Sequence, residues 1–150
     1  MNISLDAFDV KILNALEKDG ALTNSQLAEF VNLSSSQCSR RRMRLESQGI
    51  IAGYHARLNN QALGLTLRAV VRVNLNSHNQ QNENDFISLL NQHSEIKEAF
   101  SVSGDADYVL IMQCRDLASF SDFIHNILLP KPMIGQVKSE IALRQIKQPY

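Results

Sequence analysis

The sequence predicts an α+β protein, in which an N-terminal three-helix helix-turn-helix domain is linked to a C-terminal ferredoxin-like βαββαβ domain. Apolar residues recur at helical spacing through the first 50 residues, and an alternating strand pattern begins near residue 65. The 150 residues are 44% hydrophobic and 20% charged, which is typical of a globular protein that buries a core. We expect domains at residues 1–50 and 63–150, joined by a linker strand at residues 51–62.

The first helix is predicted from a short apolar pattern. Ile12, Leu13 and Leu16 repeat at helical spacing, and Gly20 follows where a helix end favours a left-handed residue. This pattern predicts a helix over about residues 6–18.

Two capping boxes mark the starts of the next two helices. Thr23 and Gln26 in "LTNSQL" have the required spacing, and Ser34 and Gln37 in "LSSSQC" repeat it. We expect the third helix to stop at Gly49. The stretch "VNLS" leaves three or four residues for the turn, which is the spacing of a helix-turn-helix.

The second domain is expected to alternate strands and helices. "LTLRAVVRVNL" predicts a half-buried strand, the polar "NSHNQQNEN" a loop, and Phe86, Leu89 and Leu90 the helix after it. "IKEAFSVSGDADYVLIMQC" predicts two strands around a Gly-Asp turn. A second helix opens at Asp116 and ends at Pro130, and "QVKSEIALRQI" is a final strand. Both helices of such a unit cover one sheet face, and a partner subunit usually covers the other.

Charge is distributed unevenly along a chain whose formal net charge is zero. Residues 1–39 carry a net charge of −3 and residues 58–150 one of −1, whereas residues 40–57 hold five arginines against one glutamate, a net +4. A neutral protein with one basic strip can still bind a polyanion, because the local field governs the encounter.

The third helix is the candidate DNA reader. An arginine run alone indicates only a solvated surface, but here it lies on the second of two capped helices, which favours DNA binding. Arginine matches the acceptors of guanine, glutamine matches adenine, and serine reaches phosphates. The candidate DNA-binding residues are Ser34, Ser35, Ser36, Gln37, Ser39, Arg40, Arg41 and Arg44.

Arg42 does not fit this scheme. It is expected about 40° from Cys38, on the buried side of the helix, while the apolar Met43 points more outward. Its stem could lie over the core while its guanidinium group reaches a phosphate.

The chain resembles the Lrp/AsnC family of feast-or-famine transcription regulators over nearly its whole length. The resemblance is carried by "LDAFDVKILNALEKDGALTNSQLAEFVNLS", "CSRRRMRLESQGIIAGYHARLN", "VSGDADYVL" and the closing "ALRQIK". It implies a winged-type DNA-binding domain, a βαββαβ domain that dimerises, and dimers that assemble into tetramers or octamers with a small effector, typically an amino acid, between them. Two positions differ from the family pattern: Arg42 stands where an apolar residue is expected, and Met133, near the family's effector pocket, where a glycine is usual.

The Gly-Asp turn is the candidate effector site. An α-amino acid needs an acidic partner for its ammonium group and N–H donors or a cation for its carboxylate, and this turn could offer both. From its residues alone the turn is equally explained as a plain hairpin. With the resemblance, the expected effector-binding residues are Ser103, Gly104, Asp105, Asp107, Tyr108 and Gln136.

We expect neither catalysis nor a cofactor other than the effector. His55, His78, His93 and His125 share no metal-ligand spacing, and the two cysteines form neither a disulfide framework nor a zinc motif. The chain shows no signal peptide and no apolar run long enough for a membrane span, which favours the cytoplasm. The expected partners are double-stranded DNA, the effector and further copies of the chain.

Two alternative functions remain open on the sequence. Some proteins that resemble this family decarboxylate sirohaem, although such an enzyme has little use for a strip of charge +4 on a recognition helix. A sensor of amino acids that acts through protein partners is the other alternative.

Overall fold

The computed structural model describes residues 4–147, which form two compact units. The first unit extends to Arg57 and the second covers Leu58–Ile146, so the division falls inside the expected linker. The first three and last three residues of the expected domains lie outside the described residues. Within residues 4–147, no helix is both long and apolar enough to cross a membrane.

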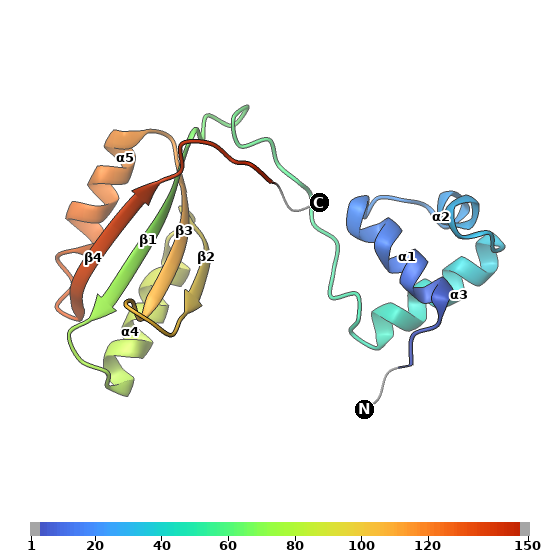
Figure 1. The fold of residues 1–150 in the computed structure, drawn as a ribbon, viewed down its shortest axis with the longest axis horizontal. Coiled ribbons are helices and arrows are strands. Elements are labelled where there is room, and N and C mark those ends of the chain that lie inside the picture. The colour runs from blue at the N-terminus through green and yellow to red at the C-terminus, as the bar shows by residue number, and fades with distance from the viewer. Residues whose placement is uncertain (1–3, 148–150) are drawn as a thin grey trace. The chain divides into compact units, whose positions relative to one another are not determined.

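The first unit consists of three helices, α1 (Ala7–Lys18), α2 (Asn24–Val31) and α3 (Ser35–Ser47) (Figure 1). Both predicted capping boxes are confirmed, since the side chains of Thr23 and Ser34 accept hydrogen bonds from backbone N–H groups three residues later. Every predicted helix of this unit is therefore present within one or two residues of its expected ends.

The first helix also has a capping box, which the sequence reasoning missed. The carboxylate of Asp6 accepts hydrogen bonds from the N–H groups of Phe8 and Asp9, and the carboxylate of Asp9 accepts one from the N–H of Asp6. The spacing of the two aspartates is that of Thr23 and Gln26, so the signal was present in "LDAFD".

A small apolar core holds these helices together. Ile12 and Leu45 are fully buried at its centre, so α1 and α3 share it. The buried apolar side chains of this cluster are Ile12, Leu16, Leu27, Val31, Cys38 and Leu45.

The predicted linker strand is wrong. Residues 51–59 have no regular secondary structure, and a turn follows at residues 60–64. An extended segment becomes a strand only when its backbone groups pair with another strand. No strand lies in the described part of the first unit, so residues 51–59 have no partner there.

The second unit has the predicted βαββαβ order. Its elements are β1 (Leu67–Leu75), α4 (Gln80–Gln92), β2 (Ile96–Ser101), β3 (Tyr108–Cys114), α5 (Leu117–Asp122), the π-helix η1 (Phe123–Leu128) and β4 (Ile134–Ile141). The sheet order is β2-β3-β1-β4 with every pair antiparallel, as Figure 1 shows. The fold class predicted from the sequence is therefore confirmed.

Two boundaries of the second unit differ from prediction. The expected loop over residues 76–84 is helical from Gln80, because the Asn79 side chain caps α4 by accepting a hydrogen bond from the N–H of Asn82. The final strand ends at Ile141, so the closing residues "ALRQI" are not part of the sheet.

The helices α4, α5 and η1 all pack on the same face of the sheet. Alternate residues of β1, from Ala69 to Leu75, belong to the same core as Phe86 of α4 and Phe120 of α5. The opposite face carries the other set of β1 side chains, including Arg72 and Asn74. This polar open face adjoins the Gly-Asp turn and positions the second candidate site.

Candidate nucleic-acid interface and effector site

Helix α3 has a buried side and an outward row. At about 100° per residue, Cys38 and Leu45 point to the same side, and both are fully buried. The opposite side carries side chains spaced four, three and four residues apart, all of them exposed: Ser36, Arg40, Met43 and Ser47. We refer to these four residues as the outward row.

The predicted serines and Gln37 gather at the N-terminus of α3. Ser34 and Gln37 cap the helix reciprocally, with Ser34 N–H donating to Gln37 Oε1 at 3.0 Å. The hydroxyl of Ser35 lies 3.3 Å from that of Ser25 on α2, and Ser39 is half-buried. Among residues 4–147, the Gln37 amide nitrogen has no hydrogen-bond partner and remains available.

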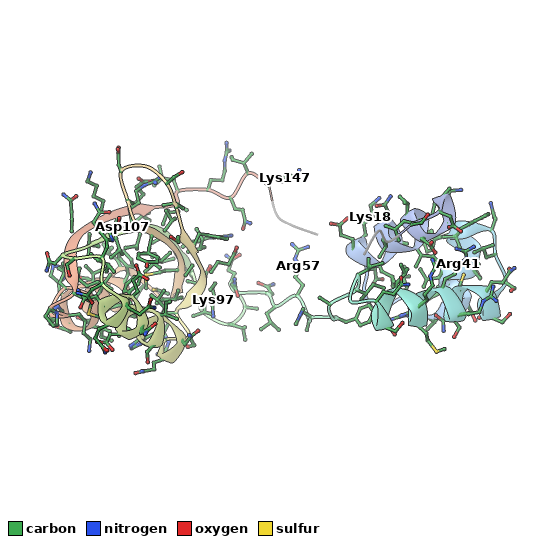
Figure 2. The ribbon with its side chains drawn as sticks, turned by 90° about the horizontal axis from the view of Figure 1, so that it is seen from below. Lys18, Arg41, Arg57, Lys97, Asp107 and Lys147 are labelled. Carbon is green, nitrogen blue, oxygen red and sulfur yellow. The ribbon has the colours of Figure 1, made fainter. Side chains whose placement is uncertain are left out.

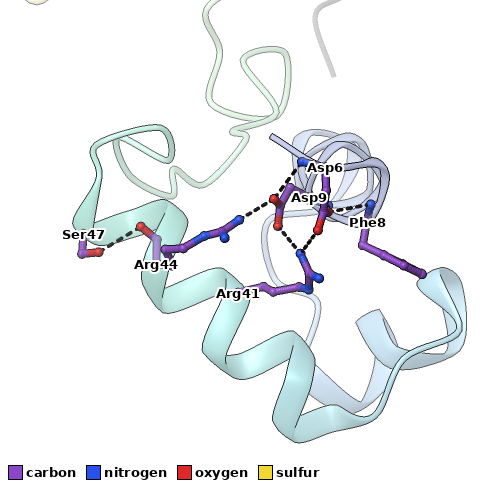
Figure 3. Close-up of polar contacts among 6 residues, drawn as sticks. All are labelled: Asp6, Phe8, Asp9, Arg41, Arg44 and Ser47. Carbon is purple, nitrogen blue, oxygen red and sulfur yellow. Dashed lines mark hydrogen bonds and ion pairs between the residues drawn. The ribbon is translucent and has the colours of Figure 1, made fainter. Parts of the chain in front are cut away.

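Arg41 and Arg44 do not extend freely toward solvent as expected. The Arg41 Nη1 atom lies 2.7 Å from Asp6 Oδ2 and 2.8 Å from Asp9 Oδ1, and Arg44 Nη2 pairs with Asp9 Oδ2 (Figure 3). The Asp9 side chain is only 1% exposed, whereas Arg44 remains 44% exposed. At about 100° per residue, Arg41 lies about 60° or less from both Cys38 and Leu45 around the helix, so it belongs to the flank that faces α1.

Electrostatics fixes this cluster in its charged state. Burial by itself raises the pKa of the Asp9 carboxyl, but hydrogen bonds from the Asp6 N–H, Arg41 and Arg44 outweigh burial and lower that pKa. The Asp9 N–H and the Arg41 guanidinium likewise lower the pKa of Asp6, and the two carboxylates raise the pKa of Arg41. All three groups are therefore ionised at neutral pH.

Arg42 is held by partners within its own unit. Its Nη1 donates to the carbonyl oxygen of Leu22 at 2.8 Å, and its Nε donates to the Tyr54 hydroxyl at 2.8 Å and to Glu46 at 3.2 Å. The guanidinium carbon also lies 4.5 Å from the Tyr54 ring centroid. Arg42 thus joins α3 to the turn before α2 and to the linker, because a buried carbonyl there needs a donor.

Arg40 is the one arginine of α3 without a polar partner in the described chain. It is exposed and stands at the centre of the outward row beside Met43, whose side chain is 58% exposed. Met43 was not among the predicted DNA-binding residues. Its place in the row follows from helical spacing alone, which could have identified it.

The Gly-Asp turn separates its two aspartates. Asp107 is held by the sheet: its Oδ2 accepts the N–H of Leu75 at 2.8 Å, and its own N–H donates to Asn74 Oδ1 at 2.9 Å. Tyr108 packs against Phe86 with ring centroids 4.7 Å apart, and burial raises the pKa of its hydroxyl. Figure 2 labels Asp107 within the second unit. In this structure, both residues support the fold.

A polar depression of about 250 Å³ lies on the open face beside the turn. Of the predicted effector residues, Asp105 and Gln136 line it, while Ser103 and Gly104 are exposed at the turn outside it. The full lining is Arg72, Asn74, Asp105, Ala106, Gln136, Lys138 and Glu140.

Sequence reasoning missed the strand residues of this depression. Arg72 is opposite Lys138 in the β1–β4 register, and Arg72 Nε lies 3.1 Å from Glu140 Oε1. Alternation along each strand placed Arg72 on the open face, but only the pairing of β1 with β4 brings Lys138 beside it. Met133, expected near the pocket, is instead buried in the core, 7% exposed.

Metal binding receives no support from the side chains of residues 4–147. They contain no group of three or more His, Cys, Asp or Glu residues arranged to hold an ion. Both cysteines are buried and free.

Comparison with known proteins gives two matches that together span most of the chain. Residues 68–150 match the family model described as the Lrp/AsnC ligand binding domain, and residues 5–52 match winged helix-turn-helix DNA-binding domains. A leucine-responsive regulatory protein of Rhizobium meliloti is 38% identical over 147 residues, covering 98% of this chain and 94% of the relative.

Solved structures agree with this assignment. A transcriptional regulator of Neisseria meningitidis in complex with L-Met superposes with a TM-score of 0.94 at 34% identity, covering 97% of this chain and 94% of the other. An AsnC family regulator of Agrobacterium tumefaciens gives a TM-score of 0.90 at 30% identity, with the same coverage of both chains.

Proposed function

The chain belongs to the Lrp/AsnC family of transcription regulators and is a DNA-binding regulator, and we propose that the outward row of α3 reads its DNA while a free amino acid controls it. The observation that carries the proposal is the exposed surface of α3, where Arg40, Met43 and the amide nitrogen of Gln37 have no polar partners within residues 4–147. These groups suit a guanine edge, a thymine methyl and an adenine edge, respectively.

Two copies of α3 are needed to reach two successive major grooves. We propose a homodimer formed through the second unit, with further assembly into tetramers or octamers. A two-fold dimer would require operators that are roughly palindromic, with half-sites about one helical turn apart. The open sheet face supports this arrangement, since one-sided sheets need a cover.

The depression beside the Gly-Asp turn is the proposed effector site. Lys138 and the Asp105 carboxylate border it, and neither has an ion-pair partner among the described residues. These opposite charges suit the carboxylate and ammonium groups of an α-amino acid. The Neisseria meningitidis relative was solved with L-Met, which supports an amino acid as the ligand class.

The proposed regulator acts without catalysis and needs no cofactor besides its effector. Binding to chromosomal DNA would place it in the cytoplasm of a prokaryotic cell. Effector binding would change how dimers assemble and hence how many operator contacts form at once.

Selection of bound genomic fragments, followed by salt titration on the selected duplex, tests the DNA-binding proposal. We expect enrichment of palindromic sites and a steep loss of affinity with salt. Failure to enrich any sequence, or copurification of a coloured tetrapyrrole, would reject the regulator in favour of an enzyme.

Thermal shift with the twenty amino acids tests the effector proposal. We expect one or a few to raise the unfolding temperature and to change operator affinity, and the Lys138→Gln and Asp105→Asn variants to lose the shift. Lys97→Gln, which removes a charge from β2 outside the depression, is the matched control. An N-acetylated form of the active amino acid should have no effect, because it lacks the ammonium group.

A further inference from the structure

Asp9 of α1 and Asp6, which caps this helix, bind two of the four arginines on α3. We propose that Asp9, assisted by Asp6, is a positioning residue that withholds Arg41 and Arg44 from the DNA phosphates and so raises the selectivity of the regulator for its operator. This inference rests on the proposed function and adds a determinant of specificity outside the DNA-contacting surface.

The first support is the set of contacts that Asp9 makes. Its Oδ1 accepts from Arg41, and its Oδ2 accepts from Arg44 and from the N–H of Asp6. The carboxylate is 1% exposed, so solvent does not compete for it. A buried carboxylate with three donors holds its partners more strongly than an exposed pair does.

The second support is that Arg41 has partners on three sides. Asp6 Oδ2 accepts from the Nη1 atom that also contacts Asp9, and the Arg41 guanidinium carbon lies 5.5 Å from the Phe8 ring centroid. The Arg41 side chain is only 21% exposed. To reach a phosphate it would have to leave two carboxylates and an aromatic face.

The third support is the positive charge of α3 that has no ion-pair partner. Asp6 and Asp9 compensate Arg41 and Arg44, and Glu46 pairs with Arg42, which leaves Arg40 as the uncompensated charge of α3. Non-specific binding to DNA depends almost wholly on phosphate neutralisation, while specific binding adds base contacts. Withholding two arginines therefore weakens non-specific binding more than operator binding.

The test measures affinity for a selected operator and for an unrelated duplex between 50 and about 300 mM salt. The 150-residue chain is compared with Asp9→Asn, Asp6→Asn and the control Glu17→Gln. Glu17→Gln removes the same charge from an exposed site on α1 that pairs with nothing on α3. A released arginine that reaches a phosphate should steepen the slope of log affinity against log salt by about 0.9.

We expect Asp9→Asn to steepen this slope by about 1 to 2 on the unrelated duplex and by less on the operator, to bind the unrelated duplex about tenfold more tightly at low salt, and so to lower the operator preference. Asp6→Asn should steepen the slope less, because Asp9 still holds both arginines. Asn also caps helices, and Asp6 is half-exposed, so this variant retains the fold even where Asp9→Asn does not.

A second pair of variants tests whether Arg41 is held away from the DNA phosphates or contacts them. Arg40→Gln should flatten the salt slope by about 0.9, whereas Arg41→Gln should leave it unchanged. Equal flattening by both variants, or equal slopes for Asp9→Asn, Asp6→Asn and Glu17→Gln, would overturn the proposal. If the wild-type chain binds no duplex, the proposed function fails, and the positioning role fails with it.

Discussion

The two units of this protein hold their charged residues in place by different means. In the first unit, ion pairs from Arg41 and Arg44 to Asp9 join one flank of α3 to α1. On the other flank, Arg42 donates to the carbonyl oxygen of Leu22 and to the Tyr54 hydroxyl. In the second unit, the Asp107 carboxylate accepts the backbone N–H of Leu75, and Tyr108 is held by an aromatic contact with Phe86.

The difference follows from the size of the two cores. Six buried apolar side chains form the described core of the first unit and fifteen that of the second. A small core leaves more of helix placement to polar contacts. In both units, charged side chains beside the core contact their neighbours, whereas Arg40 and the Asp105 carboxylate are exposed and have no ion-pair partner among the described residues.

The largest effect is expected from Leu45→Ala. Leu45 is fully buried where α3 packs on its core, so the variant should lose about 3–5 kcal/mol of unfolding free energy. Amide hydrogen exchange should rise throughout α1–α3 while the second unit keeps its protection. Leu58→Ala, at a side chain that is 66% exposed, is the control. Equal loss of protection in both units would show that the two units do not unfold separately.

Acid should destabilise the first unit through Asp9. Its pKa is lowered in the folded state, so its contribution is complete above the unfolded pKa of about 4 and disappears as pH falls through the folded value. At pH 7, Asp9→Asn should cost about 1–3 kcal/mol, less than a fully enclosed pair because Arg44 is 44% exposed. Urea unfolding monitored through α1–α3 should show the difference between the variant and the wild type shrinking as the pH falls below the usual pKa of an aspartate. Parallel pH profiles would contradict this expectation.

The two aspartates of the turn should behave oppositely. Asp107→Ala leaves the N–H of Leu75 without its acceptor and should destabilise the second unit by about 2 kcal/mol. Asp105→Ala should leave unfolding unchanged but abolish the amino-acid thermal shift. Chemical unfolding and thermal shift on both variants measure the contrast, and a reversal of the two phenotypes would assign the effector to Asp107.

The smallest effect is expected from Gly104→Ala. Gly104 has φ of 133°, a conformation that L side chains rarely adopt, although an added Cβ would meet no atom within 4 Å. Backbone strain alone should therefore lower the free energy of unfolding by about 1 kcal/mol, measured by urea unfolding. Gly53→Ala, in the linker without a positive φ, is the control. A much larger loss would mean that the turn is packed against another copy in solution.

Much of this molecule could be predicted from local pattern. The capping boxes at Thr23 and Ser34 and the alternation along β1 each depend on residues within a few positions of one another, so one sequence sufficed for them. The linker strand was mispredicted because an extended pattern does not say whether a partner strand exists.

By itself, the sequence predicted the helix-turn-helix and the βαββαβ order, because short-range spacing encodes them, and it indicated the family through a resemblance over nearly the whole chain. Only the tertiary structure decided which charged side chains have ion-pair or hydrogen-bond partners. Asp9 meets Arg44 across 35 positions and Asp107 meets Leu75 across 32, and such ion pairs and hydrogen bonds depend on how helices and strands pack. The same packing paired three of the four arginines of α3 with carboxylates, because a guanidinium group beside a carboxylate pairs with it. Among the described residues, only Arg40 of the four has no ion-pair partner, and it is exposed.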